Sequence, residues 1–163
     1  NCSLRIKKRI AGSLPALVSQ MSNSQNNAAE FTLNRQLKQD TIHIASLELS
    51  EILLINDSRY PWVILVPSCP NVSDITDLTS ENRTIFTDEI NRIASIMKKH
   101  YQPDRLNIAM LGEIVPQLHC HIIARLERDF AWAKPVWGIG DAIPYTKEER
   151  ENIINSLQKP FSC

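Results

Sequence analysis

Apolar and polar residues alternate along the first third of the chain, as they do in β-strands with one buried face. Within residues 41–55 apolar side chains recur at every second position, in the pairs Ile42 with Ile44 and Leu47 with Leu49. This period predicts strands. The run WVILVP at 62–67 is apolar throughout and rich in β-branched residues. It predicts the most buried strand, which its final proline is expected to end.

A longer period predicts the helices. Apolar residues recur at three- and four-residue spacings, as on one buried face of a helix, at Ile85, Phe86, Ile90, Ile93, Ala94 and Met97. Thr79 or Ser80 is expected to cap the start of this helix. Thr146, with Glu149 three residues later, has the pattern of a capping box and predicts a shorter helix that runs to about Gln158.

Two further strand patterns follow Pro103, at 106–111 and 117–126. A short helical piece is also expected around 33–38. One long helix with several antiparallel strands predicts an α+β fold, in which the helix packs on one face of the sheet.

Composition divides the chain into three parts. The stretch SNSQNNAAE at 22–30 is polar and lacks periodic apolar residues, so residues 1–30 are expected to form an N-terminal extension. This extension is basic, and the first methionine is Met21, so it is interpreted as upstream sequence or as a functional basic arm. Residues 31–140 are predicted to form the domain, and residues 141–163 a helical tail.

Charge and hydropathy exclude some partners. Eighteen basic and 18 acidic residues balance, so the chain has no basic face of the kind that binds long nucleic acid, while a small anionic ligand remains open. No apolar run approaches the roughly 18 residues of a membrane-spanning helix. The four cysteines are widely spaced and form no C-x-x-C unit. Free thiols in the cytoplasm are therefore expected.

Two of the four histidines lie two residues apart in the apolar run QLHCHIIAR at 117–125. In a strand, Gln117, His119 and His121 project from one face, while the apolar residues between them project from the other. Three interpretations remain open from the residues alone. In the first, the two histidines are exposed residues with no functional role. In the second, they are two ligands of a metal site for which the sequence offers no third ligand at a related spacing. In the third, they form a centre of nucleophilic or acid–base catalysis.

The flanks of this pair resemble a known family. QLHCHII resembles the signature of the histidine triad family of nucleotide hydrolases and transferases, His-φ-His-φ-His-φ-φ with φ apolar, except that Gln117 opens it. GEIVP, directly upstream, is similar to the family's lead-in to this strand, with Glu113 where a glutamine is usual. ILLINDSRYPWVILVP resembles the nucleotide-binding strand pair. A bacterial branch of the family commonly has glutamine at the first triad position.

The resemblance implies a sheet of about five strands with one long helix, and a role for each matched residue. His119 matches the nucleophile that attacks the α-phosphorus of a nucleotide and forms a covalent nucleotidyl-imidazole. His121 matches the histidine that contacts phosphate oxygens, which it is expected to do in its protonated form. The remaining matches are Gln117 near the leaving group, Asn56 at the ribose and Asn107 near the α-phosphate. No metal or cofactor is required by this scheme, and a homodimer is implied.

Two departures from the family pattern bear on substrate choice. Gln117 has no proton to give as an acid, so amine leaving groups are expected to react poorly and polyphosphates less so. Glu113 adds a negative charge at an anion site, unless it points outward or pairs with Arg125. The substrates implied are nucleotide conjugates or dinucleoside polyphosphates. A nucleotide-binding protein with little hydrolytic activity is the alternative.

Three other residues have competing interpretations. Trp132 and Trp137 resemble the aromatic tail that packs beside the active site of the family, often across a dimer interface, but they are equally expected to close the edge of the core. Cys120 is interpreted as a buried small hydrophobe rather than a nucleophile.

Overall fold

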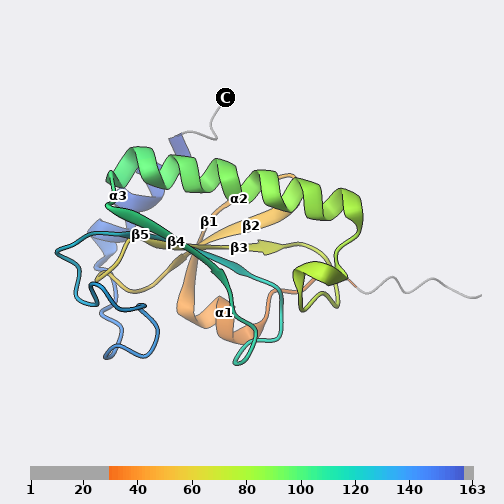
Figure 1. Ribbon diagram of the computed structural model, residues 1–163, viewed down its shortest axis with the longest axis horizontal. Coiled ribbons are helices and arrows are strands. Elements are labelled where there is room, and N and C mark those ends of the chain that lie inside the picture. Colours follow the sequence, from red (N-terminus) through yellow and green to blue (C-terminus); the bar gives the residue numbers. More distant parts are fainter. Residues whose placement is uncertain (1–29, 160–163) are drawn as a thin grey trace, which may run out of the picture.

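The computed structural model describes residues 30–159, which form one antiparallel sheet with helices on both faces (Figure 1). The strands are β1 (Thr41–Ser46), β2 (Ser50–Ile55), β3 (Trp62–Pro67), β4 (Arg105–Met110) and β5 (Cys120–Arg125). Their order across the sheet is β1-β2-β3-β5-β4, and every pair of neighbours is antiparallel. The predicted α+β class and five-stranded sheet are confirmed.

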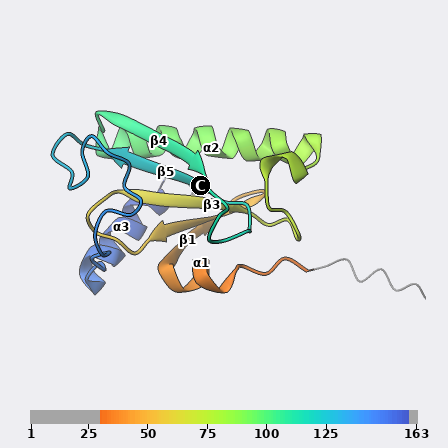
Figure 2. The ribbon, with the colours of Figure 1, turned by 60° about the horizontal axis from the view of Figure 1, so that its bottom comes forward.

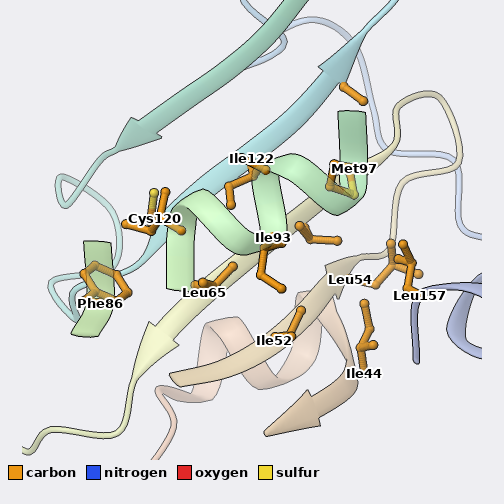
Figure 3. Packing of buried hydrophobic residues seen from close by; sticks show 14 of the residues in the cluster. Ile44, Ile52, Leu54, Leu65, Phe86, Ile93, Met97, Cys120, Ile122 and Leu157 are labelled. Carbon is orange, nitrogen blue, oxygen red and sulfur yellow. The ribbon is translucent and has the colours of Figure 1, made fainter. Parts of the chain in front are cut away.

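The face under the long helix α2 (Ser80–Tyr101) holds the larger hydrophobic core. Thr79 is its N-cap and accepts a hydrogen bond from the backbone N–H of Asn82. Figure 3 shows side chains of α2 meeting those of the strands, and its labelled residues are Ile44, Ile52, Leu54, Leu65, Phe86, Ile93, Met97, Cys120, Ile122 and Leu157. The helical period therefore predicted which side of α2 is buried, except that Ile85 is only partly buried.

A short helix, α1 (Arg35–Asp40), lies on the opposite side of the sheet from α2 (Figures 1 and 2). Leu37 of α1 is buried among Leu53, Ile64 and other residues of a second hydrophobic cluster. In the register of the sheet, Leu53 lies beside Ile64 and Ile64 beside His121. The second cluster therefore occupies the face that also carries the histidines.

The C-terminal part of the described chain begins with an irregular stretch and ends in a helix. Residues 126–145 contain no helix or strand, and α3 (Lys147–Gln158) follows. The predicted capping box is present, because the Thr146 hydroxyl accepts from the Glu149 backbone N–H and the Glu149 carboxylate accepts from the Thr146 backbone N–H. Leu157 of α3 is buried in the core under α2.

One prediction for the hairpin of β1 and β2 differs from the structure. Leu47 and Leu49 lie in the turn between β1 and β2 rather than in a strand, because the Leu47 N–H bonds the carbonyl of Ser50 and closes the hairpin. The predicted extension at 1–30 falls outside the described residues, apart from its last position. Within residues 30–159, no helix is both long and apolar enough to cross a membrane.

Candidate active site

The two histidines flank Cys120, the first residue of β5, and lie on the face opposite α2. The strand begins at Cys120, so Gln117 and His119 precede it, although a strand was expected from Gln117. His119 and His121 nevertheless lie together, with ring centroids 4.8 Å apart. Both are buried, with 6% and 7% of their surface exposed. The row expected from alternation is therefore present for the two histidines.

His119 is held by the backbone two residues before it. Its Nδ1 lies 2.7 Å from the carbonyl oxygen of Gln117. A carbonyl oxygen can only accept a hydrogen bond, so Nδ1 must carry the proton. In the neutral ring, Nε2 then holds the free lone pair. Nε2 is therefore the atom of His119 that can act as a nucleophile.

His121 has the opposite arrangement. The indole Nε1–H of Trp62 donates to Nδ1 of His121 over 3.0 Å. An indole N–H can only donate, so Nδ1 must hold the lone pair and Nε2 carries the proton of the neutral ring. Burial, with a smaller contribution from His119, lowers the pKa of His121 from 6.5 to about 3. Burial and the hydrogen bond from Trp62 therefore both disfavour the protonated form that was expected for His121.

The two rings thus offer complementary groups within one site. His119 presents a lone pair at Nε2, while His121 presents an N–H donor at the same ring position. A nucleophile beside a fixed donor is suited to attack at a centre whose oxygens gain negative charge. This pairing favours the catalytic interpretation over that of an exposed histidine pair with no functional role.

Trp137, in the C-terminal stretch, lies against His121. Its ring lies edge-on to His121 at 5.4 Å and to Trp62 at 5.8 Å between centroids. Trp132 lies elsewhere, with the guanidinium of Arg125 5.7 Å from its ring centroid, and is 39% exposed. Of the two tail tryptophans, Trp137 therefore lies beside the histidines, as the resemblance implies, while Trp132 packs against Arg125.

Gln117 does not direct its side chain amide at the histidines. Its Oε1 accepts a hydrogen bond from the backbone N–H of Asn34 at 2.8 Å, and its Nε2 donates to the carbonyl of Thr32 at 3.0 Å. Both ends of the amide are thus bonded to the segment that leads into α1. Its expected place near a leaving group remains a prediction, but one that must compete with these two bonds.

Asn107 lies on the histidine face of β4, opposite Ile123 of β5. Its Oδ1 accepts from Nη1 of Arg125 at 2.8 Å, and Arg125 also forms a two-point ion pair with Asp129. Burial raises the pKa of Asp129, but the hydrogen bonds and charge of Arg125 outweigh it and leave the pKa below its usual value. Asn107 is therefore fixed close to the sheet face where a phosphate is expected.

Asn56 follows the last residue of β2 and bonds the C-terminal stretch. Its Oδ1 accepts from the backbone N–H of Tyr145 at 3.1 Å. Tyr145 belongs to the core under α2, on the other side of the sheet from the histidines. The predicted ribose contact of Asn56 thus relies on its remaining amide N–H groups.

The neighbouring residues Asp57 and Arg59 clamp the same stretch. Asp57 pairs with Arg59 at 2.7 Å and accepts from the backbone N–H of Ile143, while Arg59 donates to the carbonyl of Ile139. Burial raises the pKa of Asp57, yet the Arg59 hydrogen bonds and charge leave it below its ordinary value. The clamp fixes the stretch that contains Trp137.

Glu113 is exposed, and Arg125 pairs with Asp129 rather than with it. Glu113 therefore points outward, which is one of the two arrangements in which its charge does not weaken anion binding. Within residues 30–159, no group of three His, Cys, Asp or Glu side chains lies close enough to hold a metal ion. The histidine pair thus has no third metal ligand in the described part of the chain.

Sequence reasoning missed two contributors to the site. Trp62 lies in the strand that the sequence predicts to be the most buried, and it is 8% exposed, but its N–H also sets the tautomer of His121. Asp129 was not singled out, although it balances the charge of Arg125 four residues before it. The only signal available for Asp129 was its position four residues after an arginine that ends an apolar strand.

A family model described as HIT domain matches residues 36–128, more than half of the chain. A search of curated protein sequences found no match.

Solved structures resemble the whole fold. A histidine triad protein from Bradyrhizobium japonicum is 42% identical, with 80% of this chain and 97% of that one aligned at a TM-score of 0.78. A histidine triad protein from Sinorhizobium meliloti is 40% identical, with 79% and 96% covered and the same TM-score. Diadenosine triphosphate hydrolase from Plasmodium falciparum is 15% identical over 86% and 89% of the two chains, with a TM-score of 0.57, and shares the fold alone.

Proposed function

The chain belongs to the histidine triad family, and on that premise we propose that it is a nucleotidyl hydrolase or transferase that acts through a covalent nucleotidyl-His119. Members of this family bind small nucleotides. The observation that carries the proposal is the complementary pair of tautomers in His119 and His121. A nucleotide conjugate or a dinucleoside polyphosphate is the proposed substrate.

In the proposed reaction, Nε2 of His119 attacks the α-phosphorus of the bound nucleotide. A phosphorus–nitrogen bond forms, the bond from phosphorus to the leaving group breaks, and the leaving group departs with that electron pair. The Nε2–H of His121 donates to a phosphoryl oxygen as its negative charge grows. One such donor contributes about 3 to 4 kcal/mol to a transition state.

The second step releases the nucleotide. Water, or another acceptor in a transferase, attacks the phosphorus, breaks the bond to His119 and loses a proton. His119 thereby regains its neutral form with the proton on Nδ1. Splitting the reaction into two displacements is the usual advantage of a covalent intermediate.

The leaving group is proposed to be one that departs without a proton from Gln117. The amide of Gln117 has no acidic proton, and both of its ends are bonded to Thr32 and Asn34. Polyphosphates meet this requirement better than amines, because their leaving oxygens are weakly basic. The diadenosine triphosphate hydrolase of shared fold makes dinucleoside polyphosphates the first substrates to test.

Intact-protein mass spectrometry under denaturing conditions tests the proposal. The protein is mixed briefly with diadenosine polyphosphates or adenosine phosphoramidates and quenched, and an added nucleoside monophosphate is expected on wild-type protein. Turnover is followed in parallel. Absence of an adduct together with unchanged turnover in a His119→Ala variant would overturn the proposal.

A second candidate function is nucleotide binding with little hydrolysis. One observation favours it. Gln117 occupies the first triad position, has no acidic proton, and has both ends of its amide bonded to the segment before α1. Calorimetry with adenosine monophosphate, followed by turnover assays across a panel of leaving groups, separates the two. Binding without turnover of any member of the panel supports this second function.

A homodimer is also proposed. Strand β4 lies at the edge of the sheet, and Ile108, Met110 and Ile114 on and after it are exposed by 46%, 37% and 90%. An unpaired strand edge with apolar side chains favours pairing with a second chain. Sedimentation velocity is expected to give twice the mass of one chain, and Ile108→Lys is expected to reduce it to one chain.

A cytoplasmic location remains part of the proposal. It is supported by the wide spacing of the cysteines, of which Cys69 and Cys120 are free in the described part of the chain. The division into a domain at 31–140 and a tail at 141–163 is likewise proposed. Fractionation of cells, with immunodetection of the native protein, tests the location.

A further inference from the structure

Gln117 connects two parts of the chain that are far apart in sequence. Its side chain bonds Asn34 and Thr32, which lie 83 and 85 positions before it. An amide carries an acceptor and a donor side by side, so it can bond one backbone N–H and one backbone C=O together. The segment at 32–34 presents that combination to Gln117.

The backbone of the same residue holds the proposed nucleophile. The carbonyl of Gln117 accepts the hydrogen bond from Nδ1 of His119 at 2.7 Å. This bond keeps the proton on Nδ1 and leaves the lone pair on Nε2. The orientation of one peptide group thus decides whether His119 can attack.

We propose that Thr32, Asn34 and Gln117 form a latch that positions His119. The latch fixes the Gln117 peptide through its side chain, and that peptide fixes the tautomer of His119. Gln117 is then a positioning residue rather than a group that touches the leaving group. This inference rests on the proposed function for its effect on rate, but its effect on the tautomer is independent of any reaction.

The segment before α1 is well suited to this role because it is itself anchored. Asn34 is the N-cap of α1, and its Oδ1 accepts from the backbone N–H of Gln36 at 2.8 Å. One turn later, Leu37 is buried in the cluster on the histidine face, with 5% of its surface exposed. Movement of the latch is therefore opposed both by the cap and by apolar packing.

The latch also gives a physical reason for glutamine at the first triad position. A neutral imidazole carries its donor and its acceptor on separate ring atoms pointing apart, so it does not bond an adjacent N–H and C=O as an amide does. A glutamate would place a carboxylate against the carbonyl of Thr32 and lose the donor. The amide is the side chain that satisfies both backbone groups.

Release of the latch is expected to act on the reaction step and not on binding. A freed Gln117 peptide can turn its carbonyl away from His119, and the proton is then able to move to Nε2, which blocks attack. The rate constant for adduct formation falls, while the affinity for a nucleoside monophosphate stays the same. A purely structural role for Gln117 would change both together or neither.

The substitution Asn34→Pro tests the latch at its N–H donor. Proline has no N–H, so the bond to Oε1 of Gln117 is lost, and the φ angle of Asn34, −53°, is one that proline adopts. Nitrogen-15 NMR of labelled histidine is expected to show His119 losing its pure Nδ1–H form. Adduct formation with diadenosine tetraphosphate is expected to slow about ten-fold, as expected for the loss of one partly buried hydrogen bond.

The matched control is Asn34→Ala, which removes the cap to Gln36 but keeps the backbone N–H. It is expected to lower the melting temperature while His119 keeps its proton on Nδ1. Gln117→Glu serves as a second variant if Asn34→Pro does not fold, with the same expected loss of the pure tautomer. A folded Asn34→Pro or Gln117→Glu variant in which His119 keeps the wild-type tautomer overturns the latch.

The outcome distinguishes the latch from the proposed function. If wild-type protein forms no adduct with any nucleotide, the proposed function fails, while the tautomer of His119 in the variants still decides the latch. If wild-type protein forms the adduct and the variants form it at the wild-type rate, the latch fails and the proposed function stands.

Discussion

The two faces of the sheet are built in different ways. Under α2, apolar side chains from the strands meet those of α2 and Leu157 of α3, and most of the cluster comes from regular elements (Figure 3). On the opposite face, the histidine pair meets Trp62 of β3, Trp137 of the irregular stretch and the segment before α1 through Gln117. The first face is held by packing that many residues share, while the second combines a smaller apolar cluster with single hydrogen bonds between distant segments.

The largest expected effect is on the rate of nucleotide cleavage, and it distinguishes His119 from its neighbour Cys120, which lies on the opposite face of the sheet. His119→Ala removes the proposed nucleophile and is expected to lower the rate of nucleotide cleavage on the order of 10⁴-fold or more. Cys120→Ala, on the face under α2, is the control, because burial raises the pKa of the Cys120 thiol to about 12 and makes it a poor nucleophile. A cleavage rate in His119→Ala equal to that of Cys120→Ala would contradict the assignment.

The next effect concerns the buried charges of the histidine face. Arg125→Ala leaves the carboxylate of Asp129 buried without its partner and is expected to reduce the free energy of unfolding by about 3 to 5 kcal/mol. Denaturation in urea measures it. Lys147→Ala breaks a pair with Glu151 that is exposed at both ends, and no measurable change is expected. Equal stability of the two variants would show that the Arg125 pair contributes nothing.

A packing substitution on the α2 face should affect stability without affecting chemistry. Ile122→Ala deletes a fully buried side chain and is expected to cost about 2 to 5 kcal/mol in free energy of unfolding. At temperatures where the variant stays folded, adduct formation on His119 is expected to proceed at nearly the wild-type rate. A rate loss as large as that of His119→Ala would mean that the two faces are not independent.

The last expected effect is a change in the pH dependence of stability. The pKa of His121 is lowered from 6.5 to about 3 in the folded protein, so the unfolded chain binds this proton more readily. The stability contribution is fully present above about pH 6.5 and is lost as the pH falls toward about 3. His121→Asn is expected to flatten the profile of unfolding free energy across this window, and an unchanged slope would contradict the lowered pKa.

The sequence predicted the α2 face more completely than the histidine face. The spacing of Ile90, Ile93 and Met97 and the alternation of Leu118, Cys120 and Ile122 are local patterns, and all six residues are buried in one core. These periods follow from helix and strand geometry, so no long-range information was needed. The same alternation correctly placed His119 and His121 on one face.

The partners of the histidines could not be predicted in the same way. The bond from Trp62 to His121 spans 59 positions, and those of Gln117 to Thr32 and Asn34 span more than 80. Such contacts depend on the three-dimensional path of irregular segments, which no periodic pattern records. The lowered pKa of His121 could not be predicted for the same reason, since its burial comes in part from these distant segments.

Nitrogen-15 NMR of histidine-labelled protein tests the central claim most directly, with the signals of the pair assigned by comparison with His119→Ala. At pH 7 the account predicts a neutral His121 with its proton on Nε2, and a His119 whose neutral form carries its proton on Nδ1. Two rings in the same tautomeric form, or a protonated His121 at that pH, would contradict it.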